Sequence, residues 1–127
     1  EADLSGAELV RANLKRAGFL GAHLGQISLA GADLVGADLW KASLAQANLY
    51  KANLEKAILW RTDLEGANLS EAKLLGAVLW RVRLVGASNL SVGQFSQVKT
   101  LYGAELDEEI RAQIERDCPH ILQKPKR

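Results

Sequence analysis

Leucine recurs at every fifth position over the first two thirds of the chain. In the register that starts at Leu4 and ends at Leu84, seventeen consecutive positions hold sixteen leucines and one phenylalanine, Phe19. Alanine stands two residues earlier in fourteen of these seventeen units. A five-residue period fits neither an α-helix nor a strand, because neither would keep these side chains on one face. The pattern predicts a chain that turns a corner in every unit and keeps two apolar side chains of each unit inside.

Four such corners close a square coil of twenty residues. Successive coils would stack through backbone hydrogen bonds at about 4.8 Å, the spacing of neighbouring strands. Leucine would fill the interior, and alanine would let the backbone segments approach closely. The predicted interior column in the middle of the chain consists of Leu34, Leu39, Leu44, Leu49, Leu54, Leu59, Leu64 and Leu69.

Units such as Ala32-Asp33-Leu34-Val35-Gly36 and Ala67-Asn68-Leu69-Ser70-Glu71 resemble the A-(D/N)-L-x-x unit of pentapeptide-repeat proteins. The resemblance covers roughly residues 2–86 in unbroken register. It implies an all-β solenoid, a right-handed quadrilateral β-helix, and the number of units corresponds to about four coils.

The five-residue register breaks after Gly86, where Asn89 stands at a leucine position. Ser91, with Gln94 three residues later, forms the capping-box pattern of a helix N-terminus, and we expect this helix to end at Gly103.

A second helix is expected to begin at Asp107 and to end before Pro119, and residues 101–107 resemble the tail of many cyanobacterial members of the family. A solenoid needs a cap on its last coil. We therefore expect a β-helix over residues 1–88, followed over residues 89–127 by a cap of two short α-helices and a basic tail.

Residues twenty apart should form columns on the outside of the β-helix. All three tryptophans fall in one column, with a column of cations after it and aliphatic residues before it. We call this surface the Trp/Arg face; it consists of Trp40, Trp60, Trp80, Lys41, Arg61, Arg81, Ile58 and Val78. It can be read as side-chain stacking that stabilises the β-helix, or as a docking surface, since Trp and Arg are enriched at interface hot spots. The two readings are compatible. On a neighbouring column we expect Asp63 and Arg83 to form an ion pair.

The amino-acid composition limits the kinds of functional site that this chain can have. The chain has 16 Lys and Arg against 15 Asp and Glu, a net charge of +1, which argues against a polyanion and a polycation alike. A single cysteine, Cys118, excludes an internal disulfide framework. His23 and His120 are far apart and have no neighbours at metal-ligand spacing. We therefore assign no catalytic, cofactor-binding or metal site and expect the protein not to be an enzyme.

Two functions follow. The first is a non-enzymatic scaffold that binds an unidentified protein through the Trp/Arg face. The alternative involves nucleic acid, which we favour less as a partner: single strands could stack on this face, or the protein could inhibit DNA gyrase as a DNA mimic, as some members of the resembled family do. Mimicry requires a strongly acidic surface, and the net charge argues against it. Self-association is left open.

Sequence signals for the compartment are few. No run of about 18 apolar residues would span a membrane, so we expect a soluble protein without a membrane contact. The chain lacks methionine even at its first position, which indicates a trimmed or processed product. No signal peptide is visible, and we favour the cytoplasm; the periplasm or thylakoid lumen would require that a signal segment had been removed.

Overall fold

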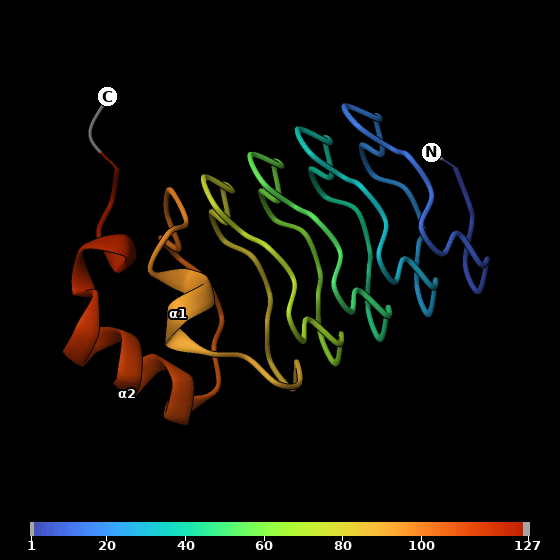
Figure 1. Ribbon diagram of the computed structural model, residues 1–127. Helices are drawn as coiled ribbons and strands as arrows, with labels where there is room; N and C mark the ends of the chain where they lie inside the picture. Colours follow the sequence, from blue (N-terminus) through green and yellow to red (C-terminus); the bar gives the residue numbers. More distant parts are fainter. Residues whose placement is uncertain (1, 126–127) are drawn as a thin grey trace.

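The computed structural model describes residues 2–125, which form a stack of angular coils with helices at the C-terminal end (Figure 1). The helical elements are α1 (Val92–Phe95), α2 (Glu108–Asp117) and a 3₁₀ helix, η1 (Pro119–Leu122). The first residue of the predicted β-helix and the last two of the predicted basic tail lie outside the described residues.

Parallel bridges join residues twenty positions apart, from Asp3 and His23 to Asn68 and Ser88. Each bridge is built from backbone hydrogen bonds on both sides of the paired residue. Ser43, for example, donates its N–H to the carbonyl of Ala22 at 2.9 Å and accepts from the N–H of Leu24 at 2.7 Å. The pairing therefore has the twenty-residue step that the five-residue period predicts.

Each corner is a tight turn closed by the backbone. The N–H of Ala32 donates to the carbonyl of Leu29 at 2.9 Å, and the same bond recurs along the chain. The last residue of every unit, from Gly6 to Gly86, lies in the left-handed region, with φ between 55° and 74°. Glycine adopts this conformation without strain, which explains its frequency at unit ends, but many units place a long polar side chain there instead.

The small polar residue between alanine and leucine stabilises the next corner. In eight units its side-chain oxygen accepts the backbone N–H two residues further on, as Asp33 does from Val35 at 3.1 Å. This is an Asx turn, a local bond that Asp and Asn form readily. It explains why these two residues are frequent at that position.

The leucine column fills the interior. Its eight members from Leu34 to Leu69 are each at most 1% exposed. At one alanine position Thr62 is buried instead, and its hydroxyl donates to the carbonyl of Leu39 at 2.6 Å. The polar group is therefore satisfied, and its burial costs little.

The first predicted helix is shorter than expected. Ser91 and Gln94 form the capping box, but α1 ends at Phe95 rather than at Gly103. Beyond it the chain returns to the β-helix with a step of twenty-two residues, since Val78 pairs with Thr100 and Arg83 pairs with Glu105. The helix stops because the following segment again offers its backbone to the coil beneath.

Backbone pairing therefore continues beyond residue 88, although the cap also begins there. Phe95 is fully buried and belongs to the same hydrophobic core as the interior leucines. The amide of Gln94 donates to the carbonyls of Leu69 and Ala72, at 2.7 and 3.2 Å, and so pairs polar groups of the last coils.

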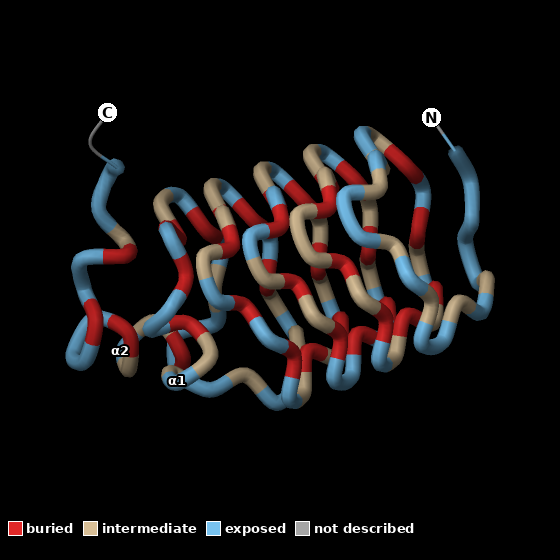
Figure 2. Tube along the Cα trace, turned by 45° about the horizontal axis from the view of Figure 1, so that its top comes forward, coloured by how far each residue is buried: buried red, intermediate tan, exposed pale blue. Residues whose placement is uncertain are grey.

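Helix α2 lies across the C-terminal end of the stack, and Figure 2 shows its inward side buried and its outward side exposed. Ile110 and Ile114 supply the buried side. Asp107, which precedes α2, does not cap this helix with its side chain but accepts the N–H of Gly86 at 3.0 Å. These contacts fix the cap to the β-helix.

Candidate docking face

The three indole rings form a continuous stack along the β-helix. The ring centroids of Trp40 and Trp60 are 4.9 Å apart with planes inclined by 5°, and those of Trp60 and Trp80 are 5.1 Å apart and inclined by 13°. These separations match the spacing of the coils that carry the rings. Both faces of Trp60 are therefore covered by other rings.

The indole N–H groups are hidden. All three tryptophans are half-buried, and each Nε1 atom is inaccessible and has no hydrogen-bond partner among the described residues. An unpaired buried donor costs about 1–3 kcal/mol. The stack consequently offers apolar ring edges to the surface and no hydrogen-bond donor.

Tyr102 extends the stack, which the sequence reasoning missed because it placed this residue in a helix. Its ring meets Trp80 edge-on, with centroids 5.8 Å apart and planes inclined by 69°. The signal was present in the sequence: Leu101 and Leu106 are five apart, with Ala104 two residues before the second. The five-residue unit resumes here after an insertion that shifts its register by two.

The predicted cations follow the indoles along the same corner. Lys41, Arg61 and Arg81 are exposed, and each occupies the left-handed last position of its unit, with φ of 60°, 55° and 58°. The Nζ atom of Lys41 lies 5.6 Å from the centroid of the Trp40 ring, a cation–π contact. Among the residues that the structure describes, none forms an ion pair with Arg61 or Arg81.

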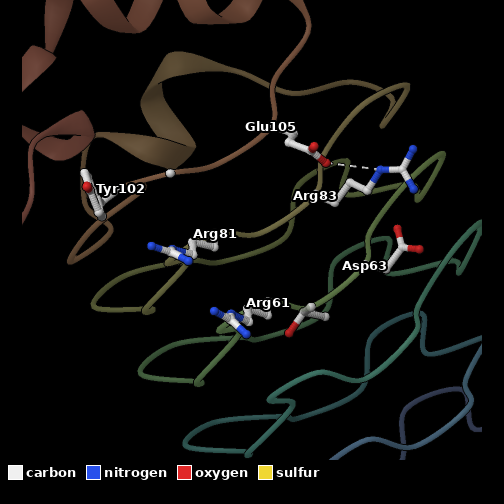
Figure 3. A pocket seen from close by; sticks show the side chains of 8 residues that line it. Arg61, Asp63, Arg81, Arg83, Tyr102 and Glu105 are labelled. Atoms are coloured by element: carbon white, nitrogen blue, oxygen red, sulfur yellow. Dashed lines mark ion pairs between the residues drawn. The ribbon is translucent and has the colours of Figure 1, made fainter.

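An open hollow of about 590 Å³ lies beside the last two cations. It is lined by Arg61, Thr62, Asp63, Arg81, Arg83, Tyr102, Gly103 and Glu105. In Figure 3 the guanidinium groups of Arg61 and Arg81 extend to the same side, where Tyr102 also lies, whereas Arg83 and the two acidic residues occupy the other side. The guanidinium groups of Arg61 and Arg81 are thus separated across the hollow from the ion pair of Arg83 and Glu105.

Arg83 does not form the expected ion pair with Asp63. Its guanidinium lies 3.3 Å from a carboxylate oxygen of Glu65 and 3.2 Å from one of Glu105. The two residues do bridge through their backbones, but the Oδ1 atom of Asp63 accepts the N–H of Glu65 at 3.0 Å in its own Asx turn. The Asx turn and the two longer glutamates explain the difference.

The aliphatic side of the face lies on consecutive coils. Ile58 and Val78 pair through their backbones, and Ile58 is 40% exposed whereas Val78 is half-buried. The Trp/Arg face therefore has three parallel strips: aliphatic residues, ring edges and cations.

Other chemistry on the described chain is limited. Within residues 2–125, no three His, Cys, Asp or Glu side chains are placed to hold a metal ion. Burial raises the pKa of the Cys118 thiol, and the charge of Asp117 raises it further. None of the helices described is long and apolar enough to cross a membrane.

Comparison with known proteins places this geometry in a family. The family profile described as pentapeptide repeats matches in 8 copies over residues 1–29, 22–61 and 62–99. The chain belongs to the pentapeptide-repeat family. Proteins of this family fold as right-handed quadrilateral β-helices and are generally structural or interaction proteins.

Solved structures of pentapeptide-repeat proteins are similar to this one. Rfr23 from the cyanobacterium Cyanothece 51142 is 29% identical with a TM-score of 0.58, and the match covers 84% of this chain and 85% of that one. A protein from the Arabidopsis thaliana thylakoid lumen is 25% identical over 91% of this chain and 75% of that chain, with a TM-score of 0.45.

QnrB1, a plasmid-mediated fluoroquinolone resistance protein, is 20% identical with a TM-score of 0.60, and the match covers 88% of this chain and 66% of QnrB1. At this identity the likeness concerns the fold alone. A search of curated proteins found no significant match.

Proposed function

We propose that this pentapeptide-repeat protein is a non-enzymatic scaffold that binds another protein through the Trp/Arg face. The observation that carries the proposal is that the guanidinium groups of Arg61 and Arg81 lie on successive coils, extend to the same side and have no ion-pair partner among the described residues. Beside them lie apolar ring edges and the exposed side chain of Ile58. Arginine and tryptophan are residue types that are enriched at interface hot spots.

The ring geometry supports a protein over a single-stranded nucleic acid. Sequence-independent binding of single strands relies on open aromatic faces on which bases stack. Here Trp60 is covered on both sides by Trp40 and Trp80, and the Tyr102 ring packs edge-on against Trp80. A base would have to separate these rings to stack. The balanced charge of the chain likewise speaks against a mimic of DNA.

The proposal is tested by affinity capture from a lysate of the native organism with quantitative protein identification. Three baits are compared: the parent protein, a test variant and a control variant. The test variant carries Arg61→Ala and Arg81→Ala. The control variant carries Arg16→Ala and Lys56→Ala. Arg16 and Lys56 occupy the same left-handed unit-end position on another corner, with φ of 58° and 59°. We expect to find a protein that the parent and the control variant retain and that the test variant does not retain. If the test variant retains the same proteins as the control variant, the Trp/Arg face is not the docking surface.

A further inference from the structure

We infer that the partner segment is an α-helix that lies along the β-helix axis and places acidic side chains at positions i, i+4 and i+7 on Lys41, Arg61 and Arg81. This inference rests on the proposed function and adds the chemistry and conformation of the partner.

The spacing of the cations favours a helix. The three residues hold the same position on consecutive coils, and the indoles beside them are 4.9 and 5.1 Å apart, so the cation column spans about 10 Å at its base. Along an α-helix, residues three or four apart rise about 4.5–6 Å and residues seven apart about 10.5 Å. Carboxylates at i, i+4 and i+7 would therefore stay in register with all three cations.

An extended segment does not fit this spacing. In a strand, side chains on one face are two residues apart and about 6.6–6.8 Å from each other. The third carboxylate of such a strand would lie about 13 Å from the first, beyond the roughly 10 Å of the cation column. A strand running along the axis would thus satisfy two cations at most without distortion.

The charges on the β-helix define the chemistry of the partner. Arg83, on a neighbouring corner, forms ion pairs with Glu65 and Glu105. Arg61 and Arg81 stand one coil apart and have no acidic partner among the described residues, so their like charges repel. Carboxylates can bind guanidinium groups through two parallel hydrogen bonds and would relieve this repulsion.

The strips next to the cations indicate which residue types the partner helix should carry beside its acidic residues. The indole N–H groups are buried, so the partner meets only ring edges there, and beyond them the exposed side of Ile58. A helix seated on the cations would turn its neighbouring positions toward these apolar strips. We therefore expect apolar residues along one flank of its acidic stripe.

Synthetic peptides test the inference on the full chain by titration calorimetry and by the fluorescence of the three tryptophans. One alanine-rich helical peptide carries glutamates at i, i+4 and i+7 and leucines along one flank. An isomer of the same composition scatters the glutamates around the helix, and a third peptide alternates threonine and glutamate to favour an extended chain. We expect the first peptide to bind at least about tenfold more tightly than the other two, and more weakly as salt is added.

Variants of the protein separate this site from general charge attraction. Arg61→Gln with Arg81→Gln should weaken binding of the first peptide by about tenfold or more, because two charge-assisted contacts are lost. Arg16→Gln with Lys56→Gln removes the same charge from another corner and should leave binding unchanged. Equal affinity for the isomer, tighter binding of the extended peptide, or tighter binding of a thymidine oligonucleotide would overturn the inference.

The two proposals can fail separately. If affinity capture depends on Arg61 and Arg81 but the helical peptide has no advantage, the face is a docking surface and the helical partner is wrong. If capture does not depend on these residues, the proposed function itself is wrong.

Discussion

The indole rings of Trp40 and Trp60 lie nearly parallel with their centroids 4.9 Å apart, and Trp80 covers the opposite face of Trp60 at 5.1 Å. The central ring is therefore an internal layer of a surface stack. Its two ring contacts stabilise the fold, and they are offset by a buried N–H group that has no hydrogen-bond partner within residues 2–125.

Two substitutions of Trp60 should separate these contributions. Trp60→Ala removes both ring contacts, each of about 0.5–1.5 kcal/mol beyond the area buried, and we expect a loss of roughly 2–4 kcal/mol. Trp60→Phe keeps a ring in the stack and removes the unpaired donor, so we expect a change within about 1 kcal/mol. Chemical denaturation followed by circular dichroism measures both. Equal losses for the two variants would show that the stack contributes little.

The repeating part of the fold was predictable because its signal is redundant. Each coil buries the same two positions in every unit, so the five-residue period of leucine and alanine specifies the coil many times over. The return of the chain to the β-helix at Thr100 was missed because it occurs once, with a step of twenty-two residues. A helical spacing of apolar residues between Phe95 and Tyr102 competed with that single weak signal.

Gly103 lies against Arg81, the last of the three cations, and a substitution at Gly103 tests how tightly the cap packs there. Its φ is +73°, and a β-carbon there would lie 2.8 Å from Cγ of Arg81. Gly36 has a similar φ of +69°, but its β-carbon would meet Cγ of Arg16 at an ordinary 3.5 Å. We expect Gly36→Ala to cost about 1–2 kcal/mol from backbone strain alone and Gly103→Ala to cost more. Thermal unfolding of the two variants gives the difference, and equal melting temperatures would mean that Arg81 moves aside freely.

The contacts between side chains of the candidate site were harder to predict than the columns in which the residues lie. The twenty-residue coil puts Asp63 and Arg83 next to each other, and their backbones do pair. Which carboxylate reaches the guanidinium depends on side-chain length and on competing local bonds, and here Glu65 and Glu105 pair with it. A sequence period contains neither of these determinants.

The buried thiol of Cys118 gives a pH-dependent prediction. Burial and the nearby charge of Asp117 raise its pKa, so the folded state favours the neutral thiol. Stability from this group is complete below the ordinary thiol pKa and falls as pH rises toward the raised value. Unfolding experiments across the alkaline range should show a steeper loss for the parent than for Cys118→Ala. A native thiol that alkylates as fast as the denatured one would contradict its burial.

Leu49 lies fully buried in the middle of the interior column, and substitutions there test whether the leucine column is the core of the fold. Leu49→Ala should cost roughly 2–5 kcal/mol, because a stacked interior of leucines cannot collapse fully around the cavity. Leu49→Asp should prevent folding, since its charge would have no partner among apolar side chains. Ala45→Ser, in the same coil but half-buried at a corner, is the matched control and should change stability by about 0.5 kcal/mol or less. Far-ultraviolet circular dichroism and denaturant midpoints report all three, and a Leu49→Asp variant that unfolds at the midpoint of the parent would show that the leucine column is not the core.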